Sequence, residues 1–269
     1  MLYGVFLGTM VVASSYSWPV AWIGLELNLM SFIPFAMTYS IHKKAAMTYF
    51  VSQSCGSLMI LLGGMLSDVS VLPLVLLLVG VVFKMGLMPL HFWVPSVAVN
   101  LSRFNLYLLM SWQKIGPLVI IMTATLGLAM LSIINAAGGA LAMSGITLLP
   151  LLLIFSGMVQ ISWVLNTSGF FTFYYISVYF IVLSAVILYS ALASTQFGWA
   201  LLNAGGLPPF SGFMIKLKAI LHIKSGVVVL LVVSSGVALT TYMRILLNTR
   251  MKMDPWSWFV VSTMAVGSV

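Results

Sequence analysis

Long apolar stretches separated by very short polar connections make up almost the whole chain. Each stretch approaches the ~20 residues that an α-helix needs to cross ~30 Å of hydrocarbon. The pattern predicts an all-α polytopic membrane protein with about eleven transmembrane helices. They are expected over Leu2–Ser17, Val20–Ile41, Ala45–Leu66, Val69–Phe92, Leu101–Ile121, Thr123–Ala142, Ile146–Leu165, Phe170–Ala193, Phe197–Ile223, Gly226–Leu247 and from Trp256 onward.

Prolines interrupt two of these expected helices. Pro89 lies inside the fourth, and the pair Pro208 and Pro209 lies inside the ninth. Proline has no N–H to donate to the carbonyl four residues earlier, so the Met85 carbonyl should be left unpaired. Within a membrane such an opening is tolerated only where it faces protein or water. We therefore expect discontinuous helices near Pro89 and Pro208.

The two interrupted helices occupy the same place in two sets of five helices. An odd number of helices per set gives the two copies opposite orientations, which is the inverted arrangement typical of secondary transporters. We expect one membrane domain over residues 1–269, with a first five-helix repeat at 1–121 and a second at 122–247. A last loop and helix should occupy 248–269. Identity between the halves is negligible by eye, so this repeat depends on the corresponding breaks.

Composition narrows the functions that are open to the chain. Apolar residues make up 62% of the sequence and charged residues 5%, against nearer a quarter charged in a soluble domain. The net charge of +8 comes from basic residues scattered between apolar spans, and these form no continuous patch for nucleic acid. The single cysteine excludes an intrachain disulfide and a four-cysteine iron–sulfur or zinc site. The three histidines show no spacing typical of metal ligands.

Four ionisable residues inside the expected spans are the candidates for function: Glu26, Lys84, Lys114 and Lys216. A charge at mid-membrane costs ~2.5 to 3.5 kcal/mol, so four idle charges would cost on the order of 10 kcal/mol. Each lysine also has a proline nearby in its helix. An ionisable side chain beside a broken span indicates a station on an ion path.

Structural interpretations of the same charges stay open. Lys216 and its neighbour Lys218 could extend from a helix end to the membrane interface. Lys114 could direct its amine at the Gln113 carbonyl, which Pro117 leaves free. Glu26, as an isolated carboxylate in a span, should be protonated or paired, and a static ion pair with one lysine is the alternative to a proton-sensitive pair.

Two uncharged or weakly basic side chains could extend such a path. His91 follows the break after Lys84 and is a possible proton relay near neutral pH, or else a member of an aromatic belt with Phe92 and Trp93. Gln160, in the seventh span, could bind a neighbouring helix or hold water in a conducting chain.

Four motifs occur in order along the chain: AWIGLELN around Glu26, FKMGLMPLHFWVP around Lys84, SWQKIGP around Lys114 and GGLPPFSGFMIK ending at Lys216. In this order they resemble the chain 2 family of mitochondrial NADH:ubiquinone oxidoreductase, the antiporter-like membrane-arm subunits of respiratory complex I. The resemblance runs from the second expected helix to the ninth. The resemblance agrees with the ion path that the ionisable residues inside the expected spans already indicated, and it names a family for it.

The resemblance implies an antiporter-like fold of two inverted five-helix repeats in the mitochondrial inner membrane, with no cofactor in this chain. Its partners would be other membrane-arm subunits and bilayer lipid such as cardiolipin, and no nucleic acid. By resemblance Glu26 and Lys84 would form a regulating pair, Lys114 a central relay, and Lys216 the terminal lysine of the second half. Together they would translocate protons, coupled to electron transfer from NADH to ubiquinone in other subunits.

Position 160 departs from the family pattern. The family usually has a histidine in the seventh helix, and here FSGMVQISW places Gln160 there. A glutamine can hold a water but cannot take up a proton. Two alternatives therefore remain beside a proton-translocating subunit: a free-standing cation/proton antiporter, and a structural subunit of the membrane arm that does not pump.

Overall fold

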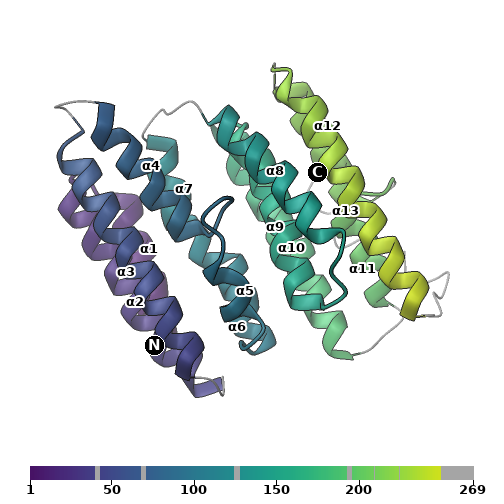
Figure 1. Cartoon of the computed structure of the whole chain (residues 1–269), viewed down its shortest axis with the longest axis horizontal. Helices are drawn as coiled ribbons and strands as arrows, with labels where there is room; N and C mark the ends of the chain where they lie inside the picture. The colour runs from purple at the N-terminus through teal and green to yellow at the C-terminus, as the bar shows by residue number, and fades with distance from the viewer. Residues whose placement is uncertain are drawn as a thin grey trace. The chain divides into compact units, whose positions relative to one another are not determined.

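The described part of the chain is built of α-helices and one short 3₁₀ helix (Figure 1). The computed structural model describes residues 1–39, 43–67, 71–123, 128–192, 196–208, 210–223 and 225–249, and in these ranges no strand occurs. The helices are α1 (Leu2–Ser14), α2 (Trp18–Tyr39), α3 (Lys43–Met65), α4 (Val71–Met85), α5 (Trp93–Ala98), α6 (Arg103–Met110), η1 (Trp112–Lys114), α7 (Ile115–Thr123), α8 (Ala129–Met143), α9 (Leu149–Leu165), α10 (Phe170–Leu192), α11 (Gln196–Gly205), α12 (Ser211–His222) and α13 (Val227–Thr249).

Five helical stretches in the described part are long and apolar enough to cross a membrane: Trp18–Met37, Lys43–Met65, Arg103–Met122, Phe170–Ser190 and Val227–Leu247. The shorter apolar helices are Leu2–Ser14, Val71–Met85, Ala129–Ser144 and Leu149–Leu165. Each expected span up to the tenth has a helix or a broken pair of helices in its place, which confirms the all-α polytopic prediction. The last expected span, from Trp256, lies outside the described residues, as do Asp68 and Pro209.

The chain divides into two compact units, Met1–Leu126 and Gly127–Val269. In the first unit α1 packs along α2, α3 packs along α4, and α7 contacts both α1 and α4. In the second unit α8 packs against α9 and α13, while α11 contacts α10, α12 and α13. The residue ranges proposed for the two repeats and the final segment stay a prediction.

Glycines let α3 and α4 pack closely at the level of Lys84. A Cβ added at Gly56 of α3 would lie 3.2 Å from the Gly80 carbonyl oxygen and 3.3 Å from the Lys84 Cβ. Small residues at helix contacts are typical of membrane proteins, where close backbone approach replaces the hydrophobic effect as the source of attraction. The contact places the α3 side chains Gln53 and Ser57 beside the end of α4.

The first discontinuity lies between α4 and α5 and is formed by a glycine. Gly86 has φ +66°, in the left-handed region. Its N–H donates to the Phe83 carbonyl at 3.2 Å, and the Leu87 N–H donates to the Val82 carbonyl at 3.0 Å. These two bonds are the Schellman motif, which ends a helix while pairing two of its last carbonyls.

The second discontinuity, between α11 and α12, repeats the same motif. Gly206 has φ +84°, its N–H donates to the Asn203 carbonyl at 3.0 Å, and the Leu207 N–H donates to the Leu202 carbonyl at 3.2 Å. The two breaks share the sequence Gly-Leu-x-Pro, with Gly86 and Gly206 in the same role. This short match between the two units is a signal that comparison by eye missed.

The breaks fall where they were expected, near Pro89 and Pro208, but proline is not what ends the first helix. α4 is already closed at Met85 by the left-handed Gly86, three residues before Pro89. Carbonyls of the last turn are paired by the cap and by side chains, since the Trp93 indole N–H donates to the Phe83 carbonyl at 2.9 Å. The cap pairs the Val82 and Phe83 carbonyls, and the expected opening at the Met85 carbonyl stays a prediction.

Replacing Gly86 by alanine should destabilise the first unit. The left-handed φ costs a non-glycine residue about 1 to 3 kcal/mol, and the added Cβ would overlap the Val94 side chain. The prediction is a lower midpoint of thermal inactivation of the solubilised protein. Gly236→Ala is the matched control, because a Cβ at Gly236 in α13 meets nothing within 4 Å. Equal midpoints for the two variants would contradict this account of the break.

Candidate functional site: buried lysines at interrupted helices

Among the lysines that the structure describes, the three singled out in the sequence are buried. Lys84 and Lys114 are each 8% exposed and Lys216 is 7% exposed. Lys218, only two residues further along α12, is exposed and lies with its amine 5.4 Å from the centre of the Tyr174 ring. Extension from a helix end to the interface therefore describes Lys218 and not Lys216.

Lys216 returns its amine to the helix break of its own span. Its Nζ donates to the Gly205 carbonyl at 2.9 Å, at the C-terminal end of α11. A cation at this position pairs with an otherwise free carbonyl and with the negative end of the helix dipole. A Cβ at Gly206 would lie 2.8 Å from this nitrogen, so glycine leaves the space that the amine uses.

Asn203 joins the two parts of the second broken helix. Its side-chain oxygen Oδ1 accepts from the Gly212 N–H at 2.9 Å and from the Ser211 hydroxyl at 3.2 Å. An asparagine from the end of α11 thereby caps the first turn of α12, where N–H groups have no partner within the helix. This cap fixes the start of α12, the helix that carries Lys216.

Lys84 sits in the last turn of α4 with its amine unpartnered. Its Nζ is buried and has no hydrogen-bond partner among the described residues. Its backbone carbonyl, in contrast, accepts from Gln53 Nε2 of α3 at 3.0 Å. A buried ammonium without a partner is rare, because desolvation is then uncompensated, so this amine is the group in the first unit that most needs water or a movable counter-charge.

Glu26 of α2 lies near Lys84 but does not touch it. The Ser57 hydroxyl of α3 donates to the Glu26 carboxylate, and the carboxylate interacts electrostatically with Lys84. No ion pair joins these two side chains in the part of the chain that the structure describes, so the static pair is not formed in this conformation. α3 contacts both α2 and α4, which places Ser57 on the helix that links the two charges.

Lys114 lies in the short 3₁₀ turn η1 between α6 and α7. The other two residues of this turn bind other helices: the Trp112 indole N–H donates to Thr9 Oγ1 of α1 at 3.1 Å, and Gln113 Nε2 donates to Asn28 Oδ1 of α2 at 2.9 Å. A mid-span 3₁₀ turn often marks a functional site or strain. The alternative bond from the Lys114 amine to the Gln113 carbonyl is not among the described hydrogen bonds.

His91 lies between α4 and α5 and is half-exposed. Its ring Nδ1 is 3.3 Å from the Pro89 carbonyl oxygen. Of the two residues expected to form an aromatic belt with it, Phe92 is exposed, but Trp93 is buried and donates its indole N–H to the Phe83 carbonyl at the end of α4. The structure leaves the proton-relay role of His91 a prediction.

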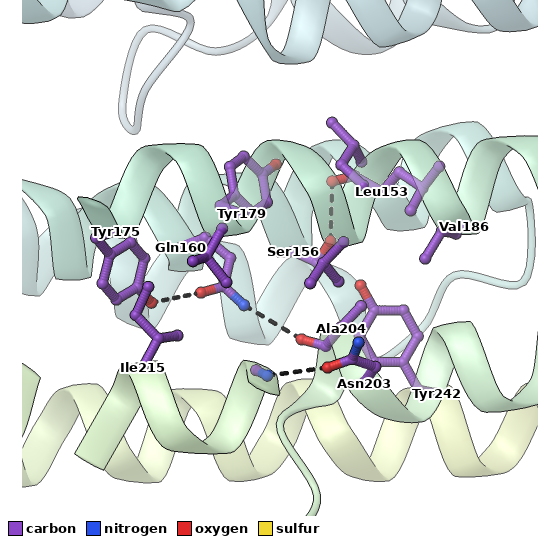
Figure 2. Close-up of a pocket in the computed structure, with 14 residues that line it drawn as sticks. Leu153, Ser156, Gln160, Tyr175, Tyr179, Val186, Asn203, Ala204, Ile215 and Tyr242 are labelled. Atoms are coloured by element: carbon purple, nitrogen blue, oxygen red, sulfur yellow. Dashed lines mark hydrogen bonds between the residues drawn. The ribbon is translucent and has the colours of Figure 1, made fainter. Parts of the chain in front are cut away.

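Gln53 and Gln160 each donate a side-chain hydrogen bond to a backbone carbonyl at one of the two breaks. Gln160 Nε2 of α9 donates to the Ala204 carbonyl at 3.2 Å, as Gln53 Nε2 does to that of Lys84. Each carbonyl belongs to the residue two positions before the left-handed glycine. Gln160 also accepts from the Tyr175 hydroxyl of α10 at 2.7 Å (Figure 2). A polar amide within an apolar span marks both glutamines in the sequence as candidates for contacts between helices. The carbonyl groups that they bind could not be predicted from the sequence.

Interrupted membrane helices, each bringing a buried lysine to the interruption, define an antiporter-like membrane protein. The fold is shared with a chain of respiratory complex I from Thermus thermophilus, at TM-score 0.77 and 21% identity over 98% of this chain and 74% of that one. It is also shared with a chain of the Mrp complex from Dietzia sp., at TM-score 0.69 and 16% identity over 90% of this chain and 58% of that one.

Similarity in sequence identifies the family, which similarity in fold alone does not. NADH-ubiquinone oxidoreductase chain 2 of Artemia franciscana is 34% identical over 91% of this chain and 87% of its own length, and that of Mytilus edulis is 31% identical over 91% and 84%. That of Myxine glutinosa is 28% identical over 95% and 86%. The chain belongs to the NADH-ubiquinone oxidoreductase chain 2 family. No family model matches it.

Removing the Gln53 amide should weaken the first unit. In Gln53→Met the buried Lys84 carbonyl loses its side-chain donor, which costs about 1 to 3 kcal/mol. The expected result is a lower thermal midpoint than that of Ser54→Ala, the neighbouring position, whose hydroxyl bonds only within its own helix. A Gln53→Met midpoint equal to that of the control would remove the glutamine from this role.

Proposed function

We propose that the chain is a proton-translocating, antiporter-like subunit of the membrane arm of respiratory complex I in the mitochondrial inner membrane. The names of its relatives and its fold support this assignment, because the Thermus chain belongs to that complex. Electron transfer from NADH to ubiquinone would be carried out by other subunits, with no redox cofactor held by this one. Its partners would be other membrane-arm subunits and lipid, including cardiolipin.

The observation that carries the proposal is the buried, unpartnered Lys84 amine at a helix break, beside a carboxylate that it does not touch. A group in this position gains from a proton only when a counter-charge or water approaches. Two opposite charges ~4 Å apart interact by ~4 kcal/mol at an effective dielectric near 20. Moving one charge against 100 mV requires ~2.3 kcal/mol, so forming and breaking the Glu26–Lys84 interaction is sufficient to drive one proton.

Lys216 would act by a different contact. Its charged amine donates to the Gly205 carbonyl, and loss of the proton weakens this bond and frees the helix end that accepts it. Protonation of Lys216 is in this way linked to the α11–α12 break. Lys114, on a 3₁₀ turn tied to Asn28 through its neighbour Gln113, would be the remaining proton carrier of the first unit.

A structural subunit that does not pump is the second candidate, and Gln160 is the observation that favours it. Gln160 is bound at both ends of its amide, to Ala204 and Tyr175, and it cannot take up a proton. A free-standing cation/proton antiporter would use the same buried lysines and would act without any other subunit. These three functions differ in what happens when a buried lysine loses its charge.

Lys84→Met tests pumping against a structural role. With the proton carrier gone we expect NADH-driven proton uptake by membrane vesicles to fall by ~10-fold or more, with the complex still assembled. Lys218→Met is the control, since Lys218 is exposed and lies outside the proposed path. A normal proton-to-electron ratio in an assembled Lys84→Met complex would leave the structural subunit as the function.

Glu26→Gln tests the carboxylate. The amide can still bind Ser57 but carries no charge to attract the Lys84 amine. Coupled turnover should fall several-fold, while the amount of assembled complex, measured on a native gel, stays at the level of the parent. Unchanged NADH-driven pumping would remove Glu26 from the path.

A further inference from the structure

A small cavity lies in the second unit where α11 ends and α12 begins (Figure 2). Its volume is about 30 Å³, and a water molecule needs roughly 10 to 15 Å³, so it has room for one or two waters. Five helices, α9 to α13, supply its lining. The polar side chains in the lining are Ser156, Gln160, Tyr175, Tyr179, Asn203 and Tyr242. This concentration of hydroxyl and amide groups in an apolar span is what a bound water requires.

Tyr179 lines this cavity and carries an unused hydrogen-bond donor. Its hydroxyl oxygen is buried and has no hydrogen-bond partner in the described part of the chain. Buried polar groups in proteins are nearly always paired, with protein or with ordered water. Because Tyr179 is one of the residues that line a cavity of the right size, water is the partner that the site can provide.

Gln160 sets the direction of the hydrogen bonds on one wall. Its Nε2 donates to the Ala204 carbonyl, which can only accept, so its Oε1 is the atom that faces Tyr175. Tyr175 must therefore donate its one hydroxyl proton to Gln160. The Tyr175 oxygen is left as an acceptor, which a donor in the cavity can use.

Three tyrosines, Tyr175, Tyr179 and Tyr242, line this cavity together. Tyr175 and Tyr179 are near enough to interact electrostatically, and so are Tyr179 and Tyr242. Ser156 lines the cavity as well, and the Ser156 hydroxyl donates to the Leu153 carbonyl at 2.9 Å. Since water and the Tyr179 and Tyr242 hydroxyls each both donate and accept, bound water together with these two groups can carry hydrogen bonds in either direction.

We propose that the cavity binds one or two water molecules through Tyr175, Tyr179 and Tyr242, and that this tyrosine-bound water carries the proton past the level of Gln160. The proposal rests on the proton-translocating function given above. The proton passes beside Gln160, which only holds the wall in place. Each water, and each of the Tyr179 and Tyr242 oxygens, accepts one proton and releases its own, whereas Tyr175 keeps the proton that it donates to Gln160 and only accepts a hydrogen bond from the water. One proton enters, one leaves, and no side chain keeps a charge.

The cavity is lined by residues next in sequence to Lys216 and to its hydrogen-bond partner, so water in it could deliver protons toward Lys216. Ile215, the residue before Lys216, lines it, and so does Ala204, the residue before the Gly205 carbonyl that binds the Lys216 amine. Water here would reach the second helix break without a titratable side chain at position 160. The chain would thereby keep a proton route in spite of its glutamine.

Tyr179→Phe is the test, made in the intact assembled complex. It removes one oxygen, keeps the ring and needs no repacking. We expect ordered water at the Tyr179 oxygen in a high-resolution structure of the parent, and loss of that water in the variant. NADH-driven proton uptake per electron should fall several-fold, whereas Tyr189→Phe, the same change on α10 outside the cavity lining, should match the parent.

The possible results distinguish a failure of the proposed water route from a failure of the proton-translocating function on which it rests. A dry cavity in the parent overturns the water site, and a Tyr179→Phe complex that pumps like Tyr189→Phe overturns the route. If the parent complex itself moves no protons while oxidising NADH, the proposed function fails instead. In the double variant Tyr179→Phe with Gln160→His, a titratable group at position 160 should restore part of the lost uptake, and no recovery would count against the route.

Discussion

A helix that stops inside a membrane leaves carbonyl groups that bulk water cannot reach, and every such group must find a partner within the protein. In this chain that constraint acts at two places, Gly86 and Gly206, and is met in the same way at both. A Schellman cap pairs the carbonyls of the last turn, and a glutamine from another helix pairs one more. At the second break the last carbonyl is paired by Lys216.

Two of the four candidate residues, Lys84 and Lys216, lie at these capped breaks. A capped break provides a fixed polar point inside an apolar unit, and there the chain places the amines that would be most costly elsewhere. At one break the lysine amine is bonded to the helix end, and at the other it is left without a partner beside a carboxylate. The two breaks share their backbone geometry but differ in what their lysine contacts, so they need not hold a proton equally tightly.

Much of this arrangement could be predicted from the sequence, because apolar length and proline give spans and breaks directly. The sequence placed Lys84, Lys114 and Lys216 inside expected spans, with extension to the interface left open for Lys216, and all three side chains are buried in the structure. The partners could not be predicted: Gln160 meets Ala204 across 44 residues, and such contacts depend on packing between helices. The cause of the first break was assigned to Pro89, although left-handed Gly86 ends the helix, since a glycine's φ is not visible in a sequence.

Membership of this antiporter-like chain in the membrane arm of complex I can be tested by asking whether the chain is part of a large NADH-oxidising assembly. Gently solubilised membranes would be separated on a native gel, probed for this chain and stained in the same lane for NADH dehydrogenase activity. The account predicts that the chain migrates only in an active band many times its own 29.3 kDa. Migration alone or as a small oligomer, without that activity, would contradict it and identify a free-standing antiporter.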